Sequence, residues 1–196
     1  MLIYEMFKNA DPRHLAYVGT STVTYGELKK AVDCYRNTLY ALGVRKGDRV
    51  GLYTANCAEF VYVYMGVTSL GAIIVPINNS LVEREVDYIL KDAGAKLLVS
   101  DTPLTVSCDF IELSRLNEKA FSENAPAAPD VSGELSEDDV CALVYTSGTT
   151  GKPKGAMLTH KNQIRNVEQY VQLVPVDENS RILCVLPMFH CYCLTV

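Results

Sequence analysis

The sequence predicts an α/β fold with a largely parallel β-sheet flanked by helices. Three apolar, strand-like segments, residues 49–54, 72–77 and 96–100, alternate with helical patterns. Short turns join these segments, and the alternation is typical of parallel strands linked by right-handed helical crossovers. Hydrophobic residues make up 48% of the 196 residues, so a substantial core can form around such a sheet.

Two short strands are expected before the first long helix. Residues 1–15 predict a short amphipathic helix and a turn, and residues 16–24 predict two strands about a glycine-containing turn. Thr24 and Glu27 have the spacing of a capping box, in which each side chain satisfies a free backbone N–H at the start of a helix. We expect Gly43 to end this helix. Its apolar positions are Leu28, Val32, Tyr35, Leu39 and Leu42.

The second and third helices are predicted from the same pattern. Asn56 and Glu59 have the spacing of a capping box, and the helix that follows is apolar nearly all round. Such a helix is usually buried on more than one side. Ser80 and Glu83 have the same spacing before the third helix. We expect each helix to end at a glycine, Gly71 and Gly94 respectively.

The middle of the chain is less regular. Residues 109–113 predict one more strand, residues 123–130 are a polar connector that contains prolines, and residues 132–139 are acidic. We interpret this stretch as a surface crossing within one larger domain. The chain then consists of a first α/β part (1–100), a connector (101–139) and the start of a second α/β part (140–196).

A strand, a loop and a helix open the last part. Residues 140–144 are a short apolar strand, and residues 145–155 are a loop rich in glycine, hydroxyl and lysine side chains. Thr159 is the expected N-cap of a helix whose inner face carries Ile164, Val167 and Val171. Residues 181–186 predict a further strand, and residues 187–190 the turn at its end.

Charge and composition exclude several classes of protein. The formal net charge is -5, so we expect no nucleic-acid partner. The N-terminus lacks the pattern of a signal peptide, and no apolar run reaches about 18 residues, so we expect no transmembrane segment. The 7 cysteines include no Cys-x-x-Cys motif, which favours reduced thiols and a cytoplasmic location. Cys191, Cys193 and His190 match no common zinc spacing.

The loop at 145–155 has the chemistry of a phosphate cradle. Glycines let backbone N–H groups converge on an anion, hydroxyls donate further hydrogen bonds, and lysine supplies charge. It is not a Walker A loop, because Pro153 follows Lys152 and Thr146 stands where the first glycine is required. Composition alone leaves open a solvated turn between two strands.

The complete motif is more specific. Residues 145–155 resemble, position by position, the signature of the adenylate-forming superfamily, which includes acyl- and aryl-CoA synthetases, luciferases and peptide-synthetase adenylation domains. Residues 71–78 with 92–96, and residues 186–190, are similar to the family's neighbouring segments. The resemblance covers essentially the whole chain. It implies the N-terminal part of the large domain of an adenylate-forming enzyme.

The resemblance implies a two-step reaction with ATP, Mg²⁺ and coenzyme A. A carboxylate attacks the α-phosphate of ATP to give an acyl-adenylate and pyrophosphate, and a thiol then displaces AMP. By resemblance, Thr146 also faces Mg²⁺, and Lys152 occupies a variable position. The residues implied to hold the β- and γ-phosphates are Thr146, Ser147, Gly148, Thr149, Thr150 and Lys154.

Two histidines are candidate site residues. In the family, the pair Phe189-His190 lines the acyl pocket, so the resemblance implies that His190 binds substrate; the alternative is a packed core histidine. Peptide-synthetase adenylation domains typically carry Asp at this position, so a fatty or aryl acid is expected rather than an amino acid. Cys191 to Cys193 stand where many acyl-CoA synthetases have Gly, which affects the expected pocket depth. We expect His160 to serve the start of its helix or to contact solvent.

Several parts of a complete family member are absent. By resemblance these are the acidic magnesium motif, the ribose-binding aspartate, the hinge and the C-terminal domain with its catalytic lysine, so no catalytic residue is assigned. We expect an N-terminal fragment of an acyl-CoA synthetase that is inactive alone and self-associates through an open sheet edge. The alternatives are a peptide-synthetase-type adenylation domain and a non-catalytic nucleotide-binding or interaction module.

Overall fold

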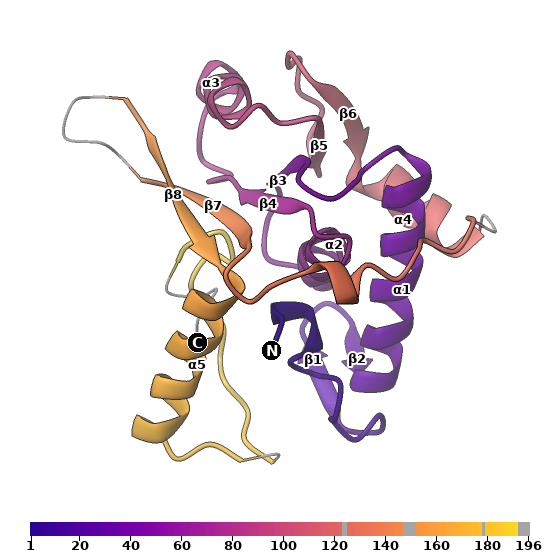
Figure 1. Cartoon of the computed structure of the whole chain (residues 1–196), viewed down its shortest axis with the longest axis vertical. Coiled ribbons are helices and arrows are strands. Elements are labelled where there is room, and N and C mark those ends of the chain that lie inside the picture. Colours follow the sequence, from indigo (N-terminus) through magenta and orange to yellow (C-terminus); the bar gives the residue numbers. More distant parts are fainter. Residues whose placement is uncertain (123–124, 147–151, 178, 192–196) are drawn as a thin grey trace.

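A six-stranded sheet forms the centre of the computed structural model, which describes residues 1–122, 125–146, 152–177 and 179–191. Its strands are β3 (Arg49–Tyr53), β4 (Ile73–Pro76), β5 (Leu97–Ser100), β6 (Asp109–Glu112), β7 (Val140–Thr146) and β8 (Lys154–Thr159). Their order is β6-β5-β3-β4-β7-β8, and all are parallel except β8, which is antiparallel to β7 (Figure 1). The predicted α/β fold with a largely parallel sheet is confirmed.

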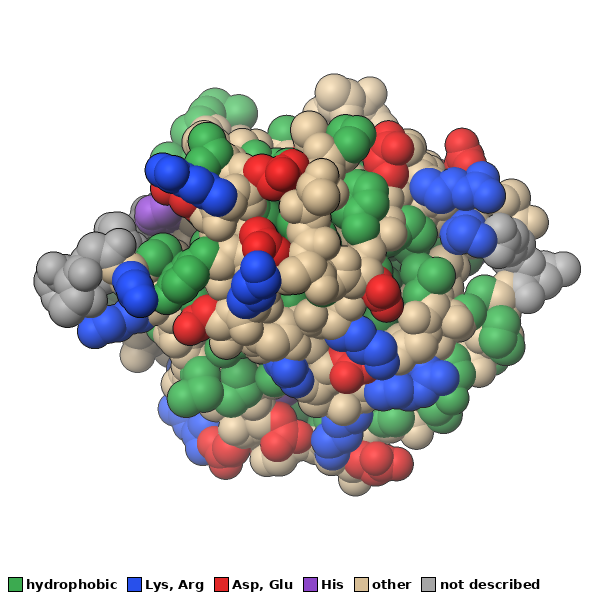
Figure 2. Space-filling view, turned by 90° about the horizontal axis from the view of Figure 1, so that it is seen from above, with side chains coloured by type: hydrophobic (Ala, Val, Ile, Leu, Met, Phe, Trp, Pro, Cys, Tyr) green, Lys and Arg blue, Asp and Glu red, His purple; other side chains and the backbone are tan. Residues whose placement is uncertain are grey.

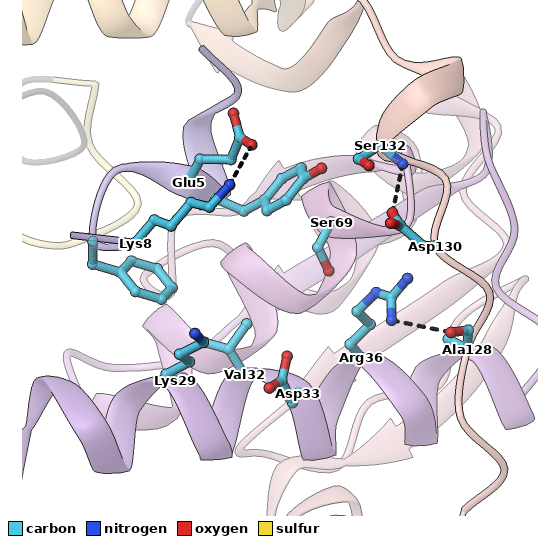
Figure 3. Close-up of a pocket in the computed structure, with 12 residues that line it drawn as sticks. Glu5, Lys8, Lys29, Val32, Asp33, Arg36, Ser69, Ala128, Asp130 and Ser132 are labelled. Atoms are coloured by element: carbon cyan, nitrogen blue, oxygen red, sulfur yellow. Dashed lines mark hydrogen bonds and ion pairs between the residues drawn. The ribbon is translucent and has the colours of Figure 1, made fainter. Parts of the chain in front are cut away.

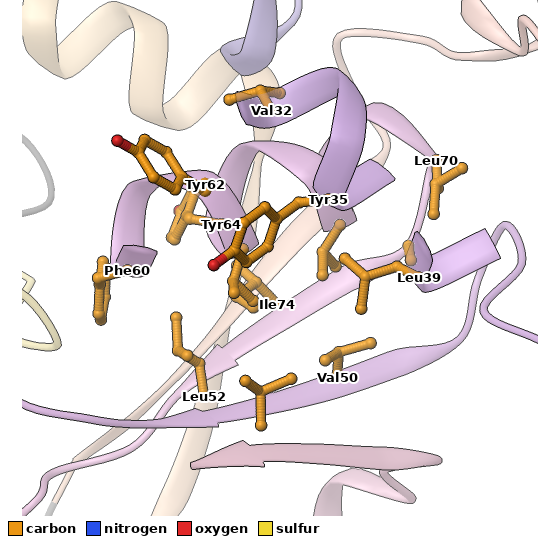
Figure 4. Packing of buried hydrophobic residues seen from close by; sticks show 14 of the residues in the cluster. Val32, Tyr35, Leu39, Val50, Leu52, Phe60, Tyr62, Tyr64, Leu70 and Ile74 are labelled. Atoms are coloured by element: carbon orange, nitrogen blue, oxygen red, sulfur yellow. The ribbon is translucent and has the colours of Figure 1, made fainter. Parts of the chain in front are cut away.

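Helices cover both faces of this sheet. Helices α1 (Tyr25–Ala41), α2 (Ala58–Ser69) and α4 (Leu113–Ser122) pack on one face, and α3 (Glu83–Ala93) packs on the other. Side chains alternate along a strand, so Val50 and Leu52 join the first core while Tyr53 joins the second. Figure 4 shows Val50 and Leu52 beneath the side chains of α1 and α2.

Helix α2 is buried on several sides, as its sequence predicted. Tyr62, Val63, Tyr64 and Val67 are all buried. The Tyr64 hydroxyl donates a hydrogen bond of 2.8 Å to Oε1 of Gln163, whose Nε2 lies 3.1 Å from the Sγ of Cys141. Burial raises the pKa of the Cys141 thiol to about 12. This buried polar chain joins α2 to β7 and to α5 (His160–Leu173).

One of the three capping boxes predicted in the first α/β part is confirmed. The N–H of Thr24 donates to the Glu27 carboxylate at 2.8 Å, and the N–H of Glu27 donates to the Thr24 hydroxyl at 3.3 Å. The glycine stops are also confirmed, because each adopts a positive φ that other residues rarely adopt. These are Gly43, Gly71 and Gly94, with φ of 90°, 69° and 60°.

The capping predictions for α2 and α3 are wrong. Helix α2 begins after Cys57, and no side chain caps it. Helix α3 begins after Val82, whose N–H donates to the Glu85 carboxylate at 3.0 Å, while Ser80 lies in the preceding turn. Asn56 lies one position before the N-cap of α2, and its side chain bonds instead to the backbone of Leu186 and Met188.

The connector contains a helix that the sequence did not predict. Helix α4 buries Leu113, Leu116 and Ala120 against α1. Beyond it, the extended chain is fixed to α1 at Ala128, whose N–H donates to Asn37 Oδ1 at 2.9 Å and whose carbonyl accepts from Arg36 at 3.2 Å. The connector therefore follows the helical face of the first α/β part.

The predicted strand at 181–186 is wrong. These residues form no strand in the described parts of the chain, and Leu183 and Val185 are 84% and 73% exposed. An apolar run becomes a strand only where a neighbouring strand offers free backbone groups, and none pairs with it here. The inner face expected for α5 is likewise only partly buried, because Ile164 is covered and Val171 is 48% exposed.

The N-terminal segment does not form the predicted amphipathic helix. Its helix, η1 (Ile3–Glu5), is a single 3₁₀ turn, and it precedes the expected hairpin of β1 (Leu15–Val18) and β2 (Thr22–Thr24). The N–H of Ile3 donates to Nδ1 of His160 at 3.1 Å. His160 is 1% exposed, so the expectation of solvent contact is wrong. Thr159 caps α5 as predicted, together with Asn162.

We expect the contact between Ile3 and His160 to weaken in mild acid. Burial lowers the pKa of His160, with Asp139 and Glu5 opposing the effect and the N-terminal charge adding to it. As the pH falls, His160 therefore takes up a proton at a higher pH in the unfolded chain than in the folded chain. The free energy of unfolding should be steady above about pH 7 and decrease as pH falls through about 6.5, by at most about 1.4 kcal/mol per pH unit. Urea unfolding across this range tests the slope.

A His160→Gln variant is the control, because glutamine retains a neutral acceptor for the N–H of Ile3. It should remove this component of the slope. Equal slopes in the two proteins would contradict the role of His160.

Three further features can be stated for the residues that the structure describes. Among the described cysteines, Cys34, Cys57, Cys108 and Cys141 are free thiols, and only Cys141 is fully buried. Within the same residues, no group of His, Cys, Asp and Glu is suited to hold a metal ion. None of the described helices combines the length and apolarity needed to cross a membrane.

Candidate phosphate-binding site

The carboxyl edge of the sheet contains a topological switch point. Strand β3 leads into α2 on one face, and β4 leads into α3 on the other. Crevices at such points are where open α/β sheets bind ligands. Strand β7 runs parallel to β4 beside it, so the predicted phosphate loop leaves the sheet at this same edge.

Two predicted phosphate-binding residues face each other at the mouth of this loop. Thr146 and Lys154 are register partners at the end of the β7–β8 hairpin, and both are exposed. Ser147, Gly148, Thr149 and Thr150 lie outside the described residues. The loop connects two antiparallel strands, and α5 begins only after β8, so a helix dipole does not supply its positive charge. That charge comes from the side chains of Lys152 and Lys154.

The base of the loop is fixed by a contact that the sequence did not reveal. The Tyr145 hydroxyl donates to Oδ2 of Asp92, on α3, at 2.6 Å. Burial and this hydrogen bond raise the pKa of Tyr145, so the phenol stays protonated and able to donate. A Cβ on Gly155 would lie 3.0 Å from the Tyr145 ring, which explains the glycine at the end of the motif. No local pattern pairs Asp92 with Tyr145, because the contact is tertiary.

His190 lies in the predicted turn at the same edge of the sheet. Its N–H donates to the carbonyl of Pro187 at 3.0 Å, and its Nδ1 is 3.9 Å from the Sγ of Cys191. The side chain is exposed, so the alternative of a packed core histidine is wrong. Asn56, in the loop after β3, contacts both residues that flank Pro187. The structure thus brings the His190 turn to the end of β3 and the phosphate loop to the end of β7.

A separate cavity of about 320 Å³ lies away from these residues. Figure 3 shows it between the N-terminal segment, α1 and the connector. Its lining includes three basic side chains, Lys8, Lys29 and Arg36, and three acidic ones, Glu5, Asp33 and Asp130. The Arg36 guanidinium already donates to the carbonyl of Ala128. The balance of charge gives the cavity no preference for a phosphate.

The wider surface does not supply such a preference either. Acidic and basic side chains are interspersed over the face seen in Figure 2. The formal net charge of -5 would repel an anion rather than attract it. An anionic ligand would therefore have to be held by local groups, and the predicted groups that the structure describes are Thr146 and Lys154, which are register partners.

The fold and the position of the loop define an open α/β protein with its ligand edge at the carboxyl ends of the strands. The chain belongs to the AMP-binding enzyme family, whose model matches residues 5–196. The predicted resemblance to adenylate-forming enzymes is therefore confirmed.

Relatives with known names agree with this family. The chain is 37% identical to long-chain-fatty-acid–CoA ligase FadD13 of Mycobacterium tuberculosis, over 94% of this chain and 39% of that protein. It is 32% identical to 4-coumarate–CoA ligase 3 of Arabidopsis thaliana, over 97% of this chain and 38% of that protein. The chain thus spans about two fifths of the length of these curated relatives.

A solved structure shares the fold. O-succinylbenzoate coenzyme A synthetase (MenE) of Bacillus subtilis, in complex with AMP, superposes with a TM-score of 0.88 at 29% identity. The match covers 100% of this chain and 52% of that one. The sheet and its flanking helices are therefore those of the N-terminal region of an adenylate-forming enzyme.

Proposed function

We propose that this chain is the N-terminal part of an AMP-forming acid–thiol ligase, which activates a carboxylic acid with MgATP and transfers it to coenzyme A. The observation that carries the proposal is the complete motif at 145–155, set at the carboxyl edge with Thr146 and Lys154 facing each other at its mouth. A carboxylate does not react with a thiol directly, because oxide would have to leave. Adenylation supplies AMP as the leaving group.

Each residue has a physical role in this proposal. Lys154 forms a charge-assisted contact with the β- and γ-phosphates, and Ser147 to Thr150 donate hydroxyl and backbone hydrogen bonds. The hydroxyl of Thr146 is the hard oxygen ligand that Mg²⁺ accepts alongside phosphate oxygens, so the donor type fits the ion. When bound, Mg²⁺ would neutralise phosphate charge. No general acid, base or nucleophile is assigned to this chain.

The proposed substrate is a fatty or aryl acid. An amino acid would require an anion for its α-ammonium group, and His190 stands where peptide-synthetase domains carry Asp. Two relatives support this choice, since their names specify a long-chain fatty acid and 4-coumarate, and both names specify CoA as the acceptor. The free thiols of Cys34, Cys57, Cys108 and Cys141 support a cytoplasmic setting for the proposed enzyme.

Pyrophosphate exchange by the longer protein tests the reaction. Fatty and aryl acids should support exchange of labelled pyrophosphate into ATP, and amino acids should not. This chain alone should form no acyl-CoA. Exchange with amino acids would identify a peptide-synthetase-type domain. Binding of ATP without exchange for any acid would identify a nucleotide-binding module.

We also propose that the isolated chain self-associates. Strand β8 has an unpaired edge among the described residues, and Met157 on it is 69% exposed. Leu183, in the segment after α5, is 84% exposed. Light scattering should show a mass that rises with protein concentration, and Met157→Glu with Leu183→Glu should reduce that rise. A constant monomer mass over a wide concentration range would contradict this proposal.

A further inference from the structure

The side chain of Asn56 joins two segments that lie far apart in the sequence. Its Nδ2 donates to the carbonyl of Leu186 at 2.8 Å, and its Oδ1 accepts the N–H of Met188 at 2.7 Å. The residue between them is Pro187, which has no N–H to offer. One carboxamide therefore satisfies the backbone groups on both sides of this proline, and it needs both its donor and its acceptor to do so.

The two residues before Asn56 are held by a residue at the end of another strand. Asp101 follows β5, and its Oδ2 accepts hydrogen bonds from the Thr54 hydroxyl at 2.9 Å and from the N–H of Ala55 at 2.8 Å. Strands β3 and β5 are parallel neighbours, so both loops leave the same edge of the sheet. The Asp101 carboxylate thus holds the two residues that precede Asn56.

The segment that carries His190 also makes apolar and backbone contacts. Met188 and Phe189 pack against the main core, and the N–H of His190 closes the turn on Pro187. Immediately upstream, Leu183 and Val185 are largely exposed. The two hydrogen bonds from Asn56 therefore help to hold the turn that carries His190 against the sheet.

We propose that Asn56 is a positioning residue that places His190 at the acid-binding end of the site. This inference rests on the proposed function, in which His190 lines the acid pocket. Loss of the carboxamide lets the Pro187 turn move. A displacement of about 1 Å at a group that orients substrate lowers reactivity by about 10- to 100-fold. The nucleotide contacts at the end of β7 do not depend on Asn56.

Two measurements test the role of Asn56. In this chain, hydrogen–deuterium exchange should become faster for residues 186–190 in Asn56→Ala. In the longer protein, Asn56→Ala should raise the KM for the acid about tenfold and change the KM for ATP less than about twofold. Asn56→Asp, which retains the acceptor for Met188 and loses the donor to Leu186, should fall between wild type and Asn56→Ala.

Asn37→Ala is the matched control, because Asn37 also accepts a hydrogen bond from the backbone of a distant segment, at Ala128. It should change neither exchange at 186–190 nor the KM for the acid. Equal exchange in Asn56→Ala and wild type, or an equal rise in both KM values, would overturn the proposal. If the wild-type longer protein activates no acid, the proposed function fails, and the exchange measurement still shows whether Asn56 anchors the turn.

Discussion

Replacing Lys154 with alanine is expected to reduce pyrophosphate exchange by the longer protein about 100-fold. Lys154 faces Thr146 at the mouth of the loop and is the motif's last charged group. The charge that builds on the departing pyrophosphate needs a cation at a fixed place, and the hairpin end supplies it without a helix dipole. The measurement is the rate of exchange at saturating acid, with and without the substitution.

Lys152→Ala is the matched control for this substitution. Lys152 is an exposed lysine in the same loop, so its removal changes the net charge by the same amount. It lies at a position that the family signature leaves variable, and its loss should change the exchange rate less than about threefold, as expected of a screened surface charge. Comparable losses in the two variants would show that the loop acts only through its overall charge.

Local patterns identified the loop and most of the elements that support it. The caps at Thr24 and Thr159 could be predicted because each capping contact spans only three residues. The end of α3 at Gly94 could be predicted because glycine adopts the left-handed conformation easily. The motif at 145–155 is contiguous, so its chemistry can be recognised before folding is considered. Thr146 and Lys154 then meet because the hairpin register pairs them.

Contacts between distant segments could not be predicted in this way. Asp92 holds Tyr145 and Asn56 holds the Pro187 turn across separations of 53 residues and more than 100 residues, respectively. The spacing of Asn56 and Glu59 imitates a capping box, but the Asn56 carboxamide is used by the backbone at Leu186 and Met188. A local propensity was overridden by a tertiary contact.

At residues 181–186 the sequence predicts a strand that the structure does not contain. Its apolar, β-branched residues have strand propensity, but a strand also requires a partner with free backbone groups. Propensity alone therefore gives the wrong answer there. Helix α4 was missed because its apolar positions, Leu113, Leu116 and Ala120, form a short stripe in a polar region and are identified only by their packing on α1.

Tyr35 provides a quantitative test of how that unpredicted helix stabilises the fold. Tyr35 lies on α1 and is fully buried, and its ring makes edge-on contacts with Tyr62 of α2 at 5.5 Å and with Phe121 of α4 at 6.1 Å between centroids. Its hydroxyl donates to Oδ1 of Asn117 on α4 at 2.8 Å. Burial raises the pKa of Tyr35, so the hydroxyl remains a donor. One side chain thus joins three helices over the sheet. Figure 4 shows the rings of Tyr35 and Tyr62 above the strands.

Tyr35→Ala is expected to lower the free energy of unfolding of this chain by about 4 kcal/mol, because it removes a buried ring and leaves a cavity. Tyr35→Phe, which retains the ring and removes only the bond to Asn117, should lower it by about 1 kcal/mol. Urea unfolding of both variants gives the two values. In a chain that already carries Asn117→Ala, Tyr35→Phe should cause little further loss of stability, since the two changes remove the same bond. If Tyr35→Ala were no more destabilising than Tyr35→Phe, the three helices would not depend on the packing of this ring.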